Sequence, residues 1–401
     1  MFSRIFAAFK YREFRLMWLG ACTSTIGTWM QKAAQSWLVL ELSKSKFLLG
    51  LDSFLGEIPI LLLSLLGGVA SDRFDRRKLL IASQVGQMTT ALILAVLFAT
   101  DTVQVWHILL LSFFTGCVQA FGGPAYQAIL PMMVPKEEVQ NAIAMNSIQF
   151  NIARVIGPML GGWALVSLGP AWCFSINGLS FLAVIFALLA MTPKRGGGNR
   201  SESVLKSIRG GIDFVSCRAG MLPLIALAFF MTFFGFPMMV FLPVMVKEVF
   251  GQDSIGYTRM LTVSGAGSIV GGLIVAGLSH SDRKGRYALL NLIALGTLIV
   301  GFSLSRNLWL SYGILFLASG ALIATFAMIA SLVQTEATDE MRGRVMSLYN
   351  VAFRGGGPIG ALLCGQLIEF SSAPVVLSGC GTLLALMGLW FLVVQRRIPQ
   401  L

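Results

Sequence analysis

The chain has 401 residues, of which 56% are hydrophobic and 12% are charged, and its mean hydropathy is +0.78. Soluble globular proteins carry roughly 25% charged residues, so this composition excludes a soluble enzyme, a nucleic-acid-binding protein and a disordered scaffold. The net charge of +12 is explained by the Lys and Arg residues that gather in the cytoplasmic loops of membrane proteins. The sequence therefore predicts an integral membrane protein.

Stretches of about 20 mainly apolar residues predict twelve membrane-spanning helices and an all-α fold. The first fifteen residues are basic and are expected to form a cytoplasmic tail, because the apolar stretch after them is too long for a cleavable signal. The first six spans are expected near 16–40, 47–71, 79–100, 106–130, 141–166 and 171–191. The second six are expected near 221–246, 256–279, 287–305, 309–334, 344–368 and 373–394.

A polar segment separates the two sets of spans. It is basic and glycine-rich at its start, and apolar residues recur at helical spacing from Val204 to Val215, which predicts a short helix on the membrane surface. The expected domains are an N-terminal six-helix bundle at 1–192, a cytoplasmic linker at 193–220 and a C-terminal six-helix bundle at 221–401.

The basic residues predict the orientation. With both termini in the cytoplasm, 22 of the 30 Lys and Arg residues fall in inner segments and four in outer loops. The other four, Lys32, Arg154, Arg259 and Arg354, lie within predicted spans.

Cysteine and histidine give little sign of a metal site. The six cysteines show no CxxC spacing and are interpreted as small apolar packing residues, and the two histidines are far apart in sequence. No metal and no cofactor are expected.

Two sequence patterns repeat at long range. Arg154-Val155-Ile156-Gly157-Pro158 returns as Arg354-Gly355-Gly356-Gly357-Pro358, and Asp72-Arg73 returns as Asp282-Arg283. Repeats of this length predict two six-helix halves in parallel orientation, related by an axis along the membrane normal. Such halves rock against each other around a central cavity, which is the alternating access of a transporter.

Two motifs resemble those of the major facilitator superfamily. The segment Gly68–Arg77 is similar to that superfamily's first cytoplasmic loop, with Asp75 where a Gly is usual. The fifth span carries Gly157-Pro158-Met159-Leu160-Gly161-Gly162, similar to the motif of drug/proton antiporters. Its small residues also suit close helix packing, and Pro158 suits a gating bend. The whole chain most resembles bacterial exporters of the macrolide-efflux and enterobactin-export type.

The resemblance has two gaps. The best-known drug antiporters carry an Arg in the fourth span, whereas residues 115–119 here contain none, so their proton-coupling mechanism does not transfer directly. The second loop copy is degenerate, with Tyr287 in place of Arg77, and is expected to matter less.

The first loop is expected to form a cytoplasmic gate. Asp72 ends the second span, where the helix dipole disfavours a carboxylate, so it is predicted to find a positive partner. The partner would be the inner end of span 11 or one of Arg73, Arg76, Arg342 and Arg344, which would latch the two halves. The gate residues are Gly68, Asp72, Arg73, Arg76 and Arg77. A solvated charge run that only sets topology is the alternative.

Ionisable side chains within spans are costly, by about 2.5–3.5 kcal/mol at a helix centre, and are therefore candidates for function. Glu57 is predicted to bind and release protons, with Lys32 or Arg154 as the approaching positive charge. Asp52 lies nearer the outer interface, and a Lys32–Glu57 or Lys32–Asp52 pair is expected if the helix faces meet. A static ion pair that fixes helix register is the alternative for Glu57.

Other polar and aromatic residues are candidates for the substrate cavity, although individual side chains of this kind often face only lipid or core. They are Trp29, Gln31, Gln35, Gln119, Tyr126, Asn146, Gln149, Phe233 and Arg354. A structural role is favoured for Arg354.

The sequence therefore predicts a secondary transporter that exports an amphipathic small molecule in exchange for protons. It is expected to be a monomer in a bacterial inner membrane, with lipid, a small-molecule substrate and protons as its partners and no nucleic acid. No P-loop is present, so ATP is not the expected energy source. The alternatives are an uncoupled or importing carrier of a metabolite or lipid-like molecule, and a non-transporting sensor; an enzyme is not expected.

Overall fold

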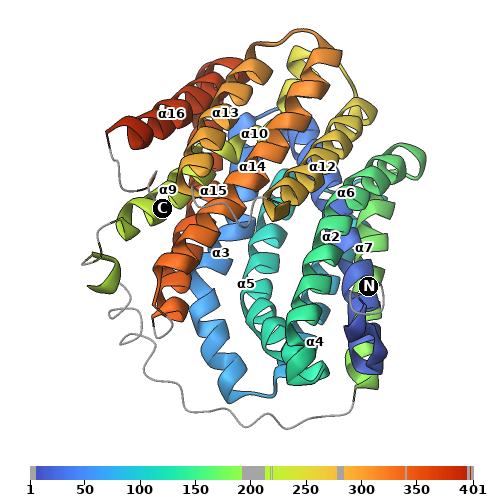
Figure 1. The fold of residues 1–401 in the computed structure, drawn as a ribbon. Coiled ribbons are helices and arrows are strands. Elements are labelled where there is room, and N and C mark those ends of the chain that lie inside the picture. Colours follow the sequence, from blue (N-terminus) through green and yellow to red (C-terminus); the bar gives the residue numbers. More distant parts are fainter. Residues whose placement is uncertain are drawn as a thin grey trace. The chain divides into compact units, whose positions relative to one another are not determined.

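A computed structural model describes residues 6–191, 213–216, 218, 220–277, 284–338, 341–394 and 398. These residues are mostly helical and include no strand (Figure 1). The predicted surface helix at 204–215 and the repeated Asp282-Arg283 lie wholly or largely outside the described residues.

The first part of the chain contains six long helices and three short 3-10 turns. In order they are η1 (Ala7–Lys10), α2 (Arg12–Ser43), α3 (Lys46–Arg73), α4 (Arg76–Ala99), α5 (Val105–Ile129), η2 (Leu130–Met133), η3 (Lys136–Glu138), α6 (Val139–Ser167) and α7 (Pro170–Ala190). Their ends follow local rules: Gly169, for example, takes a φ of 92° and is followed by Pro170, which starts α7.

The second part repeats this plan with a broken first helix. In order it contains α9 (Met221–Gly235), α10 (Pro237–Val240), α11 (Leu242–Val244), the π turn η4 (Met245–Val249), α12 (Ser254–Gly277), α13 (Lys284–Leu304), α14 (Leu308–Glu336), α15 (Arg342–Phe370) and α16 (Ala373–Val393).

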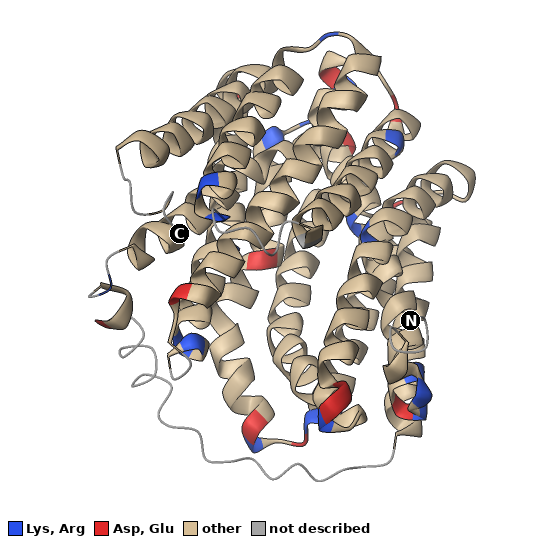
Figure 2. Cartoon of the chain, viewed as in Figure 1, with Lys and Arg blue, Asp and Glu red and all other residues tan. Residues whose placement is uncertain are grey.

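Ten of the described helical runs are long and apolar enough to cross a membrane, judged by length and composition alone. They include the run Met221–Val249 from α9 to η4. The other two long helices, α2 and α6, have 32 and 29 residues and carry polar side chains along their middles. Together these twelve runs match the twelve predicted spans, and the chain is an all-α multi-pass membrane protein. Figure 2 accordingly shows that most of each helix bears neither acidic nor basic residues.

The seventh span differs from its prediction. A single helix was expected near 221–246, but α9 ends at Gly235 and is followed by α10, α11 and η4. Pro237 and Pro243 lie in this stretch. Proline donates no backbone hydrogen bond and its ring crowds the preceding turn, so the two prolines account for the interruption.

The chain divides into two compact units. The first contains Met1–Ser43 and Leu55–Ser201, and the second contains Lys44–Phe54 and Glu202–Leu401. The start of α3 therefore belongs with the second unit, while the rest of this continuous helix belongs with the first. The expected division at 193–220 stays a prediction, because most of that segment lies outside the described residues.

The two units share one packing scheme. In the first, α2 packs against α6, and α4 against α5 and α7. In the second, α9 packs against α15, and α13 against α14 and α16. Each pair in one unit thus has a counterpart in the other, as expected for a parallel duplication.

Glycines set the closest of these contacts. A β-carbon on Gly161 of α6 would lie 2.7 Å from the carbonyl oxygen of Met30 in α2. In the second unit, a β-carbon on Gly360 of α15 would overlap the carbonyl oxygen of Phe233 in α9. Small residues therefore let the paired backbones touch. Gly157 and Gly356 make the corresponding contacts one turn earlier, so the packing repeat is offset by 199 residues rather than the 200 read from the sequence motif.

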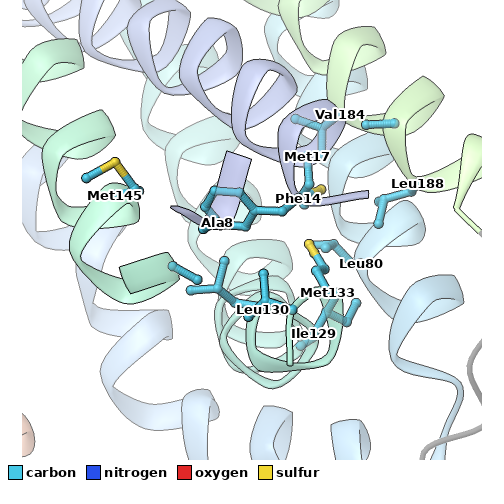
Figure 3. Close-up of a cluster of buried hydrophobic side chains, with 14 residues drawn as sticks. Ala8, Phe14, Met17, Leu80, Ile129, Leu130, Met133, Met145, Val184 and Leu188 are labelled. Atoms are coloured by element: carbon cyan, nitrogen blue, oxygen red, sulfur yellow. The ribbon is translucent and has the colours of Figure 1, made fainter. Parts of the chain in front are cut away.

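A cluster of buried apolar side chains joins several helices of the first unit (Figure 3). Phe14 and Met17 of α2 meet Leu80 of α4, Ile129 of α5 and Leu188 of α7. Because Leu80 lies one turn beyond Arg76 in α4, this cluster also anchors the loop between α3 and α4.

Candidate transport site

An ion pair lies between two helices of the first unit. The Lys32 Nζ of α2 is 2.9 Å from the Glu57 Oε1 of α3, and the two side chains are 53% and 34% exposed. The structure thus brings together two of the four residues proposed for proton coupling. α3 is apolar around Glu57, whereas Gln31 and Gln35 flank Lys32 on α2, so the pair joins an apolar helix to a more polar one.

One aromatic ring borders the ion pair, and a second ring packs against the first. The Lys32 ammonium lies 5.9 Å from the centre of the Trp29 ring, within the range of a cation–π contact. Trp29 in turn meets Phe150 of α6 edge to face, with ring centres 5.9 Å apart. A β-carbon on Gly157 would lie 2.5 Å from that of Trp29, so the close approach at Gly157 brings Trp29 against α6.

Arg154 of α6, the third proton-coupling candidate, does not join this pair. Its side chain is partly buried and makes no hydrogen bond or ion pair with any residue that the structure describes. Arg354, its counterpart in the sequence repeat, is exposed in α15. Asp52, the fourth proton-coupling candidate, is buried at 8% exposure and lies in the part of α3 that belongs to the second unit.

A chain of side-chain hydrogen bonds crosses the first unit beside the ion pair. The Asn177 amide of α7 donates to Gln31 Oε1 at 2.6 Å, and Gln31 donates to Gln35 Oε1 at 3.4 Å. Gln35 then donates to the Ser112 hydroxyl of α5 at 2.8 Å. The Ser180 hydroxyl donates to Asn177 Oδ1 at 3.3 Å and so extends these hydrogen bonds by one residue within α7. Gln31 and Gln35 were predicted as polar residues of the site, whereas Asn177 and Ser112 were missed.

The remaining amide and aromatic candidates are separate from this chain. Gln149 is buried and donates to the Ala21 carbonyl oxygen at 3.1 Å, which holds α6 to α2. The Tyr126 hydroxyl donates to Asn146 Oδ1 at 2.6 Å, which joins α5 to α6. Gln119 is partly buried in α5. Phe233 of α9 stacks on Phe229 and meets Phe234 edge to face.

The span 5 motif serves mainly the contact with α2. Gly157, Pro158, Gly161 and Gly162 are all buried in α6, and Pro158 lies within the helix without ending it. Packing is therefore a sufficient account of the two close-contact glycines.

Asp75, the unusual residue of the loop between α3 and α4, has a structural role. Its carboxylate accepts hydrogen bonds from the backbone amides of Arg77 and Lys78 at 2.9 and 3.2 Å, and so caps the N-terminus of α4. The residue that departs from the family motif thus begins the next helix.

The predicted gate residues pair within their own unit. The Asp72 carboxylate lies 3.6 Å from the Arg76 guanidinium, which also donates to the Ser71 carbonyl oxygen. Arg77 donates to the Leu189 carbonyl oxygen near the end of α7 at 2.9 Å. Arg73 is exposed, and a β-carbon on Gly68 would meet nothing within 4 Å. The latch that Asp72 was predicted to form stays a prediction.

A second carboxylate acts on a helix end in the other unit. Glu369 Oε2, near the end of α15, accepts from the backbone amides of Lys46 and Phe47 at 2.8 and 3.1 Å and from the Ser45 hydroxyl. Lys46 Nζ also pairs with Glu248 at 2.8 Å. No local pattern predicts this cap, because its donors and acceptor are separated by more than 300 residues.

The described residues hold no group of three or more His, Cys, Asp or Glu side chains that could bind a metal ion. The contacts that the structure shows at the site are an ion pair, hydrogen bonds and aromatic contacts.

Solved structures with the same architecture are transporters. The nucleoside transporter NupG superposes with a TM-score of 0.74 at 12% identity and covers 94% of this chain and 98% of its own. A bacterial homologue of the human lysosomal transporter Spinster gives 0.70 at 14% identity, with 96% of each chain covered. These likenesses show the fold.

Sequence relatives place the chain more narrowly. The staphyloferrin A transporter of Staphylococcus aureus is 24% identical and covers 84% of this chain and 85% of its own length. The enterobactin exporter EntS of Shigella boydii is 24% identical, with 96% and 93% covered. The MFS-type transporter YfiS of Bacillus subtilis is 25% identical, with 93% and 91% covered.

The family model described as "transmembrane secretion effector" matches residues 3–401, almost the whole chain. Together with the fold, this match identifies a secondary transporter rather than an enzyme. The chain belongs to the transmembrane secretion effector family of the major facilitator superfamily.

Proposed function

We propose that the protein exports an amphipathic small molecule by alternating access, and that protons move in the opposite direction. Its place is the inner membrane of a bacterium, with both termini in the cytoplasm. Relatives that are named as an enterobactin exporter and a staphyloferrin A transporter support the export of a small molecule. The observation that carries the proton part is the Lys32–Glu57 pair between α2 and α3.

The pair can respond to a proton because its two charges stabilise each other. When Glu57 is ionised, Lys32 has a counter-charge 2.9 Å away. When Glu57 takes up a proton, this attraction is lost and Lys32 keeps its charge within a predicted span without that counter-charge, which is costly. The two protonation states therefore favour different surroundings for the pair, and a conformational equilibrium shifts with them.

Two alternatives use the same fold. If the ion pair only fixes the register of α2 and α3, the protein is an uncoupled or importing carrier. The missing Arg in residues 115–119 of α5 favours that alternative. A sensor that moves nothing has little use for charges inside the membrane.

The test uses the full-length protein in liposomes with an imposed pH gradient, screened for proton movement on addition of candidate amphipathic substrates. We expect substrate-dependent proton flux in the wild type and its loss in Glu57→Gln, with retention in the control Glu41→Gln, an exposed carboxylate near the end of α2. Proton flux that persists in Glu57→Gln excludes the proton role of Glu57. Substrate movement without proton flux favours the uncoupled carrier.

A further inference from the structure

Arg154 carries a charge that its surroundings leave unbalanced. Its partly buried side chain has no hydrogen-bonding or ionic partner among the described residues, whereas Lys32 has Glu57. An arginine stays charged at any physiological pH, and a charge within the membrane needs a partner. Among the described residues no anion balances this charge, so an anion from outside the chain would complete the site.

The neighbours of Arg154 on its helix are aromatic. Phe150, Arg154 and Gly157 are spaced at i, i+4 and i+7, so they share one face of α6. Trp29 meets the Phe150 ring and lies against Gly157. On α6, Arg154 thus lies between Phe150 and Gly157, the two residues that Trp29 contacts. The rings of Trp29 and Phe150 form an apolar aromatic surface on this side of the helix.

The net charge of the predicted spans is positive, like the charge of Arg154. These spans contain four basic residues, Lys32, Arg154, Arg259 and Arg354, and two acidic ones, Asp52 and Glu57. A negatively charged substrate bound among these spans reduces their excess of positive charge, whereas a positively charged substrate increases it.

We infer that Arg154 binds the anionic group of the transported molecule while Trp29 and Phe150 hold its apolar part, an inference that rests on the proposed transport function. The substrate class is an organic anion in which a carboxylate or sulfonate lies next to an aromatic or other flat apolar group. A guanidinium group binds such oxygen pairs with two parallel hydrogen bonds. Export of this anion is favoured by an inside-negative membrane potential, whether or not protons are exchanged.

Binding is tested with two probes of matched shape and opposite charge, 2-naphthalenesulfonate and trimethyl(2-naphthylmethyl)ammonium. Equilibrium dialysis compares full-length protein in nanodiscs with empty nanodiscs. We expect the sulfonate to bind about tenfold or more tightly than the cation, and Arg154→Gln to lose about tenfold or more of that affinity. Arg154→Lys keeps part of the preference for the anion, and Phe150→Ala weakens both probes alike.

The control variant is Arg259→Gln, which removes an exposed arginine from α12 and is expected to leave sulfonate binding unchanged. Size-exclusion elution and the thermal midpoint verify that each variant is folded. The inference is overturned if folded Arg154→Gln binds the sulfonate as tightly as the wild type, if the cation binds better, or if the wild type does not bind the sulfonate.

A transport measurement separates this inference from the proposed function. Liposomes with a potassium diffusion potential report the movement of each probe. If the cation moves and the sulfonate does not, export stands and the anion site is excluded. If sulfonate binding depends on Arg154 but neither probe moves, the anion site stands and the transport function is contradicted.

Discussion

Asp75 shows how one residue can depart from a family motif and gain a structural task. The position usually holds Gly in this loop, and the sequence alone made Asp75 a simple exception. In the structure its carboxylate accepts hydrogen bonds from two backbone amides and caps the N-terminus of α4 directly after α3 ends. The substitution therefore stabilises the tight connection that carries Arg76 and Arg77.

Asp75→Ala is expected to destabilise the first turn of α4 by about 1 kcal/mol, because the amides of Arg77 and Lys78 lose their acceptor. Hydrogen exchange of these amides should then be roughly fivefold faster, the factor that corresponds to about 1 kcal/mol. Asp75→Ser keeps a capping oxygen and should exchange like the wild type, and Asp75→Gly should lie between them. Equal exchange in Asp75→Ala and the wild type would contradict the cap.

Side-chain partners were predictable only where the chemistry left few choices. Lys32 and Glu57 stand out in the sequence because charges are rare in apolar spans, and the structure pairs them. Asn177 gave a similar but weaker signal, as a single amide in an apolar run, and was overlooked. Glu369 is one of several acidic residues near helix ends, and its role depends on the distant Lys46 and Phe47, which no local pattern reveals.

At the scale of single helices, hydrophobic length predicted the elements well and prolines limited the prediction. The apolar runs identified the twelve spans, because a helix that crosses a bilayer needs about 20 apolar residues. Prolines alone do not predict the interruption after Gly235. Pro59, Pro124, Pro158 and Pro358 also occur in the sequence, and each of them lies within a continuous helix. Whether a proline ends a helix depends on the packing around it, which the sequence does not state.

The contact between α2 and α6 leaves no room for a side chain at Gly161. Gly161→Ala places a β-carbon 2.7 Å from the Met30 carbonyl oxygen, and a backbone atom cannot move aside as a side chain can. We expect a loss of about 1–3 kcal/mol in stability and a lower thermal midpoint in detergent.

Gly313→Ala in α14 is the matched control, because its β-carbon would meet nothing within 4 Å. Alanine favours a helix over glycine by about 1 kcal/mol, so this variant should be as stable as the wild type or more stable. A similar midpoint for both variants would show that the close approach at Gly161 is not required.

At the scale of the whole molecule, the duplication read from short motifs is visible as a repeated set of helix pairs. The motif repeat predicted two halves, and the pairs α2–α6 and α9–α15 are counterparts. The offset of one residue between motif and packing arises because Gly157 precedes its proline by one position and Gly356 precedes its proline by two. The helix contacts therefore repeat with the glycines, at 199 residues, whereas the sequence motif repeats with the arginines and prolines, at 200.

Pro59 lies in α3 shortly after the point where the helix passes from the second unit to the first. Proline supplies no amide to the carbonyl of Leu55 four residues earlier, so α3 lacks a backbone hydrogen bond there. Under alternating access, Pro59→Ala should stiffen the helix, raise the thermal midpoint and slow transport by about tenfold, equivalent to about 1.4 kcal/mol in the barrier.

Pro124→Ala serves as the comparison, because Pro124 lies in α5, entirely within the first unit. It should also raise the thermal midpoint while leaving the transport rate unchanged. Equal rates for Pro59→Ala and the wild type, measured in liposomes, would show that α3 need not flex at this point.

The division of α3 has a consequence for how the transporter can vary. Glu57 lies two residues past the division and two before Pro59, so the acid and the weakest turn of the helix occupy the same five residues. A substitution in these five residues that changes the proton affinity of Glu57 therefore also changes the flexibility of the helix. Under the proposed proton role of Glu57, ion preference and switching speed are therefore linked, and a change in the coupling ion would require a change in both.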